Sequence, residues 1–206
     1  MNHYASDLEA LFNQGFLTSH NTRLVGGCDE PIYQPSVCLD VSQSPTLVGS
    51  NIKLGCSDAR EHLNVIESHI CYREDFFASA LHEVAHWCIA GEQRRKLIDY
   101  GYWYEPDGRS PSQQADFQIA ECKPQALEWI FSIICRSDFS VSLDNLQSIE
   151  APHNAAPFLT MVRQMVFEYC ANGLPPRAQI FALALRNFYR SGCVFELAVE
   201  IPKAMS

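Results

Sequence analysis

The chain has 206 residues, of which 47% are hydrophobic and 19% are charged, a composition typical of one globular domain with a substantial core. Its formal net charge of −9 argues against a nucleic-acid-binding surface, which requires clustered basic residues. No apolar run is long enough to cross a membrane, so we expect one soluble domain over residues 1–206 with neither a membrane nor a nucleic acid as partner.

The amino terminus and the cysteines indicate a compartment. Residues 1–7 contain neither the basic region nor the apolar region of a secretory signal. The nine cysteines form no C-x-x-C pair, which excludes a zinc knuckle of that type and a thioredoxin motif. Cys88, Cys135 and Cys170 fall in helical apolar patterns, where a free thiol behaves as a small hydrophobic group. We expect a cytoplasmic protein in a reducing environment.

The first third of the chain predicts one short helix and a small sheet. Ser6 and Glu9 match a capping box, which predicts a helix through Phe12 that stops near Gly15. Proline and glycine then interrupt the chain repeatedly up to Cys71, a pattern typical of short strands and long loops. The predicted strands are Thr22–Val25, Ile32–Tyr33 and Asn64–Glu67.

The spacing of apolar residues predicts four helices in the rest of the chain. They begin near residues 74, 112, 154 and 176 and end near residues 91, 136, 171 and 192, and a last strand is predicted over residues 194–199. Pro124 falls inside the second of these helices, where it must kink the helix or start a new one just after Cys122. The elements predict a helix-rich α+β fold with a small sheet from the amino-terminal half.

The most informative motif is His82-Glu83-Val84-Ala85-His86, inside the first of these helices. Residues four apart lie on one face of a helix, so His82 and His86 can bind one metal ion. Glu83 lies beside that face, where it can act on a metal-bound water or hold a proton. The alternative is a pair of hydrogen-bonded core histidines, but the surrounding apolar pattern favours a metal because bare imidazoles are rarely buried without partners.

A catalytic metal site requires a third protein ligand and open positions. Glu121 is the best candidate, because it lies between apolar neighbours on the later helix, where a carboxylate needs a cation as partner. Asp116 and Glu128 compete with it, either as ligands or as groups that hold an imidazole N–H. We therefore predict that the motif helix packs against the helix that carries the third ligand.

Two His and one carboxylate serve two chemistries. In a zinc metallopeptidase Glu83 acts as the general base on zinc-bound water, whereas in a non-haem Fe(II) oxygenase the open face of the metal binds dioxygen. A third alternative is a binding module with a closed, structural metal site. Cys88 is the nearest fourth ligand for such a site, but it lies on a different helix face from His86.

Residues 99–109 contain four closely spaced aromatic residues followed by the turn Pro106-Asp107-Gly108, which predicts an extended segment running into a turn. The segment either packs over the core or forms a pocket wall near the metal. In the second case the Tyr100–Tyr104 segment, which includes Tyr102 and Trp103, can line an aliphatic chain, and Asp99, Glu105 or Asp107 can meet an ammonium group.

The residues around the motif are similar to those of a known family. Residues 81–91, Arg94-Arg95, residues 99–109, Glu121 and residues 123–129 together resemble the bacterial elongation factor P hydroxylase family, and the match is dense from about Phe76 to Trp129.

The resemblance implies an enzyme that hydroxylates the conserved, normally β-lysylated lysine of translation elongation factor P. It implies a metal cofactor, Fe(II), with molecular oxygen as co-substrate. By position, the metal ligands of the family correspond to His82, His86 and Glu121.

Overall fold

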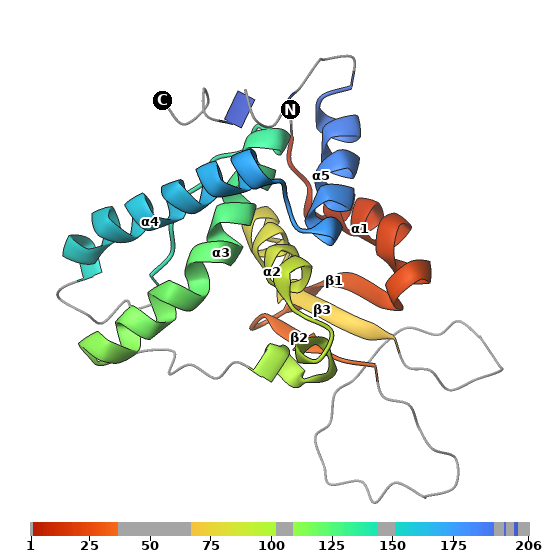
Figure 1. Ribbon diagram of the computed structural model, residues 1–206. Helices are drawn as coiled ribbons and strands as arrows, with labels where there is room; N and C mark the ends of the chain where they lie inside the picture. The colour runs from red at the N-terminus through yellow and green to blue at the C-terminus, as the bar shows by residue number, and fades with distance from the viewer. Residues whose placement is uncertain are drawn as a thin grey trace, which may run out of the picture.

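The computed structural model describes residues 2–36, 67–101, 109–143, 151–191, 196 and 200–201. In this part of the chain there are five α-helices, two short 3-10 helices and a three-stranded sheet, and the first two α-helices pack against the sheet (Figure 1). The predicted helix-rich α+β class is confirmed.

The sheet consists of β1 (Thr22–Cys28), β2 (Ile32–Gln34) and β3 (Ser68–Arg73), in the order β1-β3-β2. The central strand β3 pairs in parallel with β1 and antiparallel with β2. The first two predicted strands are confirmed, and both are longer than predicted. Of the third predicted strand, residues 64–67, only Glu67 is described, and it directly precedes β3, a strand that the sequence did not predict.

Cys28 of β1 and Cys71 of β3 are paired, with their Cα atoms 6.1 Å apart, which differs from the expectation of free cysteines in a reducing environment. The sequence did not indicate this pair, because 43 residues separate its members. Cys88, Cys135 and Cys170 are free thiols, as predicted, and the first two are buried.

Helix α1 (Ala5–His20) is longer than predicted and begins elsewhere. Its N-cap is Tyr4, without a side-chain cap, so the predicted capping box at Ser6 is wrong. The helix also continues through Gly15, because Phe16 extends the buried stripe of Leu8 and Phe12, and burial of that stripe outweighs the helix-breaking tendency of one glycine.

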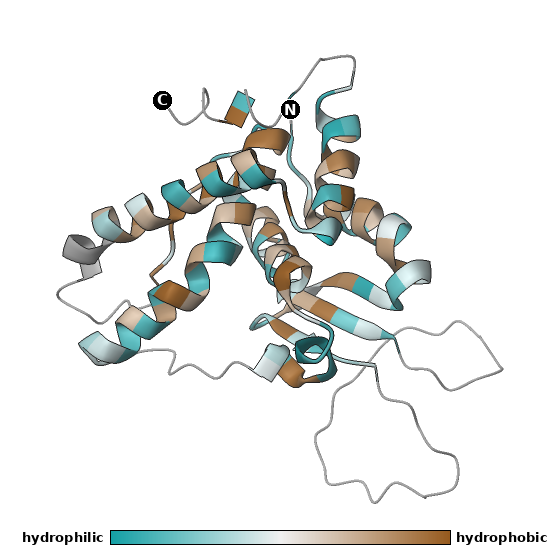
Figure 2. Cartoon of the chain, viewed as in Figure 1, coloured by the Kyte–Doolittle hydropathy of each residue, from teal (hydrophilic) through white to brown (hydrophobic). Residues whose placement is uncertain are grey.

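Helix α2 (Phe77–Ile89) lies at the centre of the molecule and packs against β3, α3 and α5 (Figure 1). Leu81, Val84 and Trp87 on this helix are fully buried. Figure 2 shows that apolar residues of α2 and its neighbours meet at this centre. The helix begins two or three residues later than predicted, since the predicted start at Glu74 or Asp75 precedes the N-cap, Phe76.

Helix α3 (Pro111–Cys135) begins with a capping box between Ser110 and Gln113. Pro124 lies inside this single helix, so no second helix begins after Cys122. Helix α4 (Ala151–Asn172) and helix α5 (Pro176–Tyr189) follow. The last predicted strand, 194–199, lies outside the described residues except for Glu196. None of the described helices is long and apolar enough to span a membrane.

Two short 3-10 helices, η1 (Arg94–Lys96) and η2 (Ile98–Gly101), follow α2. The extended conformation predicted from Asp99 onward is wrong at its start, because Asp99 and Tyr100 both have positive φ angles, 47° and 58°. This left-handed conformation turns the chain back against β2. Tyr102, Trp103 and Asp107 lie outside the described residues.

Candidate metal centre

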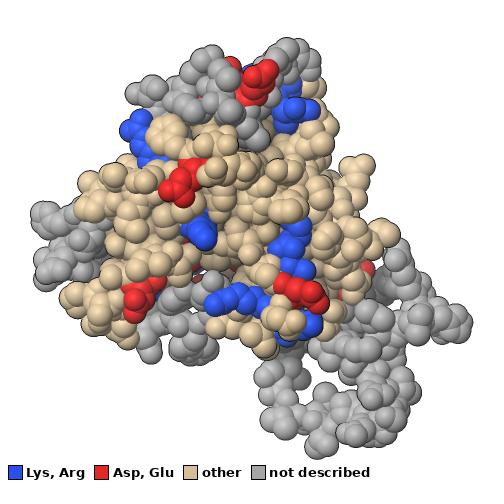
Figure 3. Space-filling model, viewed as in Figure 1, with Lys and Arg blue, Asp and Glu red and all other residues tan. Residues whose placement is uncertain are grey.

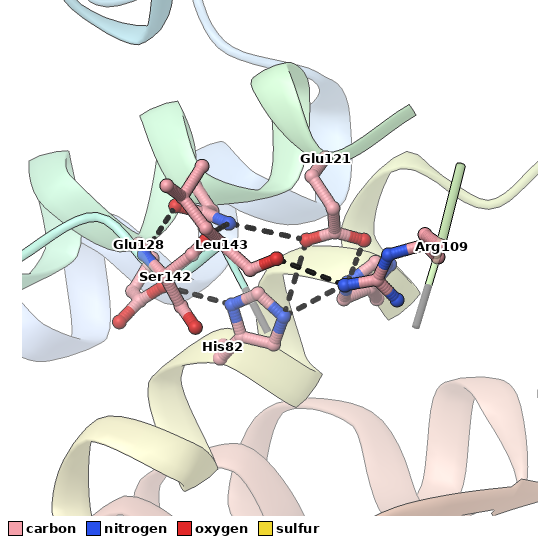
Figure 4. Close-up of polar contacts among 8 residues, drawn as sticks. His82, Arg109, Glu121, Glu128, Ser142 and Leu143 are labelled. Atoms are coloured by element: carbon pink, nitrogen blue, oxygen red, sulfur yellow. Dashed lines mark hydrogen bonds and ion pairs between the residues drawn. The ribbon is translucent and has the colours of Figure 1, made fainter. Parts of the chain in front are cut away.

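The structure brings His82 and His86 of α2 together with Glu121 of α3, and Figure 4 shows the His82 ring facing the Glu121 carboxylate. One potential ligand atom of each lies within 4.8 Å of the others. The two Nε2 atoms of the histidines are 3.0 Å apart, and the Glu121 carboxylate oxygens lie 3.5 Å from His82 Nε2 and 3.3 Å from His86 Nε2. The predicted packing of the motif helix against the helix of the third residue is confirmed.

The two histidines are partly exposed to solvent, whereas Glu121 is almost fully buried. On α2 the apolar residues turn to the core, so the two imidazoles at the i and i+4 positions face α3 and stay 21% and 15% exposed. Glu121 is only 4% exposed. A buried carboxylate that faces two imidazole nitrogens, with a little solvent access, is the arrangement that a shared cation stabilises.

Glu128 fixes the orientation of His82. Its Oε2 lies 2.8 Å from His82 Nδ1, and the side chain is buried. A carboxylate at Nδ1 places the proton of the neutral imidazole there and leaves the lone pair of Nε2 directed at Glu121 and His86. Glu128 therefore supports an imidazole instead of joining the ligand group, while Asp116, the other competitor, is exposed on α3.

The charges of His82, His86, Glu121 and Glu128 shift the pKa values of one another. Burial disfavours the charged form of His82, but the hydrogen bond to Glu128 and the charges of Glu128 and Glu121 outweigh it and raise its pKa to about 10. Burial likewise disfavours the Glu121 anion, yet the charges of His86 and His82 lower its pKa to about 2. The geometry thus attracts positive charge to the point where the three side chains meet.

These residues fit a divalent metal ion. With Nδ1 of His82 protonated by its partner, two imidazole nitrogens 3.0 Å apart need a cation or a shared proton between them. Two nitrogen ligands and one carboxylate suit iron or zinc and leave open positions. Within the described residues Cys88 does not join the group, and burial raises its pKa to about 12, which disfavours a thiolate ligand.

Glu83 lies next to His82 in the sequence but outside the ligand group. Its side chain is partly accessible, and no hydrogen bond joins it to another described residue. Burial raises the pKa of its carboxyl, and the charges of His82 and His86 oppose that effect. A carboxyl with a raised pKa beside a metal group is suited to holding or transferring a proton.

A polar network behind Glu121 was missed by the sequence reasoning. Gln125 Nε2 donates to Glu121 Oε2 (3.5 Å) and to the carbonyl of Ser142 (2.8 Å), and its Oε1 accepts from Ser142 N. The i+4 spacing between Glu121 and Gln125 was the available signal. The buried Arg109 donates to the carbonyl of Leu143 (Figure 4), so the segment after α3 is held beside the metal group from two sides.

A cleft of about 1140 Å³ opens beside the centre, with His86 in its wall. The other walls come from the end of α2, η1, Lys123 on α3, and parts of α4 and α5. Figure 3 shows Lys and Arg side chains gathered near the middle of one face of the molecule, with acidic side chains among them. The cleft opens the neighbourhood of His86 to solvent.

Two comparisons with known proteins point to the same family. The profile of the elongation factor P hydroxylase family matches residues 54–198. A curated protein of Haemophilus influenzae, elongation factor P lysine hydroxylase, is 42% identical to this chain over 189 residues, which is 92% of this chain and 91% of the relative.

Proposed function

The chain belongs to the elongation factor P hydroxylase family, and we propose that it hydroxylates the conserved, normally β-lysylated lysine of translation elongation factor P. The observation that carries the proposal is the His82, His86 and Glu121 group, found in a chain that aligns with a lysine hydroxylase over nearly its whole length. The substrate would be a cytoplasmic protein, so we also propose a cytoplasmic location.

In this proposal His82, His86 and Glu121 hold Fe(II). A bound Fe(II) would supply the chemistry that inserts one atom of O2 into a C–H bond and releases the other as water, with two electrons and two protons from an external donor. Glu128 keeps His82 in the tautomer that presents Nε2, and Gln125 orients the Glu121 carboxylate.

Glu83 holds or transfers a proton beside the reacting carbon. Glu83 adjoins the ligand residue His82 in the sequence, and burial raises the pKa of its carboxyl, which favours a role in holding a proton. The zinc metallopeptidase reaction would use the same side chain as general base, so the motif alone does not separate the two reactions. Family membership favours hydroxylation.

The aliphatic stem of the modified lysine is proposed to lie along Tyr102 and Trp103, with Asp107 near its charged end. These three residues follow η2 directly in the sequence, and η2 itself lies close to His86. A long side chain with apolar carbons and a cationic end suits a surface of aromatic rings and carboxylates.

The test is the intact mass of elongation factor P incubated with this protein, Fe(II) and oxygen. We expect a gain of one oxygen atom on the modified lysine, and no gain with the His82→Ala variant. If the iron-loaded protein adds no oxygen, the proposal fails, and zinc content and peptide cleavage would then be measured.

A further inference from the structure

The cleft beside His86 is more basic than the protein as a whole. Of the six Lys, Arg, Asp and Glu residues that line it in the described part of the chain, four are basic, whereas the whole chain has 15 basic and 24 acidic residues. Figure 3 shows Lys and Arg side chains over the end of α2, in the view of Figure 1. Positive charge gathered in a cleft of an acidic protein attracts an anionic group. The charged lining residues are Arg94 and Arg95 of η1, Lys123 of α3, Arg177 of α5, Glu92 and Glu168.

Two of these guanidinium groups are held side by side. Arg95 Nη1 donates to the carbonyl oxygen of Ala90 at 2.7 Å, and Arg177 Nη2 contacts the same oxygen. Arg177 Nη2 also contacts the carbonyl oxygens of Trp87 and Cys88, at 2.9 and 3.0 Å. The last carbonyls of α2, where the helix dipole favours cations, therefore fix both groups at the wall of the cleft.

No carboxylate neutralises these two groups. The ion pairs among the described residues include neither Arg95 nor Arg177, and they do not include Lys123. Burial lowers the pKa of Arg177, and the charge of Arg95 lowers it further, so the two cations repel each other. Arg95 is partly exposed and uses only Nη1 in hydrogen bonds to described residues, so its other N–H groups can bind an anion in the cleft.

The size and lining of the cleft suit a polypeptide. Its volume of about 1140 Å³ exceeds the roughly 300–1000 Å³ of most small-molecule sites. Apolar side chains, among them Ile89, Met165 and Tyr169, lie in the same walls as the cations. His86 belongs both to the cleft and to the candidate metal group, so a segment bound in the cleft lies next to that group.

We propose that this cleft docks an acidic segment of the protein substrate, with Arg95, Arg177 and Lys123 as its charged contacts. Arginine N–H groups bind carboxylates through strong charge-assisted hydrogen bonds, and apolar walls suit the rest of a peptide segment. The same positive charge disfavours entry of the cationic modified lysine, so the cleft holds the body of the substrate and leaves that side chain for the metal group. The proposal rests on the proposed function and adds the surface that binds elongation factor P.

Two substitutions in the cleft test the proposal. Lys123→Glu reverses a charge at an exposed position, and Arg95→Gln removes a charge but keeps an N–H donor. Arg186→Glu and Arg186→Gln, at an exposed position of α5 outside the cleft, are the matched controls. Zinc content and thermal unfolding of Lys123→Glu should equal those of Arg186→Glu, so that a change in binding is not a loss of metal or fold.

The measurement is binding of β-lysylated elongation factor P to the zinc-loaded protein, without turnover, at low and high salt. We expect Lys123→Glu to associate about tenfold more slowly than its control at low salt, because charges at an interface act mainly on the association rate. Arg95→Gln should bind about tenfold more weakly than its control, the scale of one charged hydrogen bond. Both differences should shrink at high salt.

A charge exchange then identifies the partner residue. Acidic residues of elongation factor P around the modified lysine are changed to lysine one at a time, and at least one such variant should bind Lys123→Glu more tightly than unsubstituted elongation factor P does. The proposal is overturned if Lys123→Glu and Arg95→Gln bind like their controls, the result expected if the cleft serves a small anionic co-substrate, or if no exchange restores binding.

Failure of the docking proposal is distinct from failure of the proposed function. If the iron-loaded protein hydroxylates elongation factor P while both cleft variants bind it like their controls, the docking surface alone is refuted. If the unmodified protein neither binds nor hydroxylates elongation factor P, both are refuted.

Discussion

Substitution of Glu128 tests how a residue that contacts the ligand His82, but not the metal, supports metal binding. The Glu128 carboxylate oxygen lies 2.8 Å from His82 Nδ1, and the Glu128 side chain is buried. Glu128→Gln retains an oxygen that can accept the Nδ1 proton but loses the negative charge. Glu128→Ala removes the acceptor altogether and leaves the imidazole free to rotate or change tautomer.

The expected loss of metal affinity differs between the Glu128→Gln and Glu128→Ala variants. Loss of such a partner lowers metal affinity by about 10- to 100-fold, or roughly 1.4–2.7 kcal/mol. We expect Glu128→Gln near the lower value, because the tautomer is kept, and Glu128→Ala near the upper value. Glu128→Ala should also lower the free energy of unfolding of the metal-free protein by about 1–3 kcal/mol, since a buried N–H loses its acceptor.

The assay is competition between the protein and a chelator of known affinity, with Fe(II) under anaerobic conditions and with zinc. Glu30→Gln, at an exposed turn before β2, is the control for loss of one negative charge. Metal affinity equal to that of the control in both Glu128 variants would refute the reasoning, because His82 would then not depend on its Nδ1 partner.

Three further predictions follow from the same structure. Glu83→Gln should keep its metal, since Glu83 is outside the ligand group, but hydroxylate about a hundredfold more slowly or worse; full activity in this variant would exclude a proton role. Saturation with metal at about 100 times the dissociation constant should stabilise the protein by about 2.7 kcal/mol in thermal unfolding, and an equal response in His82→Ala would contradict the assigned ligands. Arg177 donates to three carbonyl oxygens at the end of α2, so Arg177→Ala should cost about 2–3 kcal/mol in urea unfolding, while the exposed Arg186→Ala should cost little; equal losses in the two variants would show that the contact to α2 is unimportant.

The two histidines of the candidate metal site were predictable because they are close together in the sequence. His82 and His86 are four residues apart, and helical geometry alone places them on one face. Glu121 required a second argument, a carboxylate in an apolar helical pattern, together with the resemblance to the family. The role of Glu128 remained open in the sequence because its partner, His82, is 46 residues away and only the packing of α2 on α3 joins them.

The wrong predictions of secondary structure have a different origin, because tertiary contacts decide these elements. Gly15 was interpreted as the end of a helix, but burial of Phe16 against the core carries α1 past it. Alternating aromatic residues indicated an extended segment from Asp99, whereas the structure has left-handed backbone at Asp99 and Tyr100. Positive φ angles are uncommon outside glycine, and here they are held by tertiary contacts, among them those of Asp99 and Tyr100 with Tyr33 and the hydrogen bond from Arg94 to the Tyr100 carbonyl.

The central claim is that oxygen from O2 enters the modified lysine of elongation factor P at the site made by His82, His86 and Glu121. The most direct measurement is a reaction under isotopically heavy dioxygen in ordinary water, followed by mass spectrometry of the lysine-containing peptide. The account predicts one heavy oxygen atom on that lysine, and none when Glu121→Gln replaces the unmodified protein. Light oxygen at that lysine, or an unchanged lysine with iron-loaded protein, would contradict it.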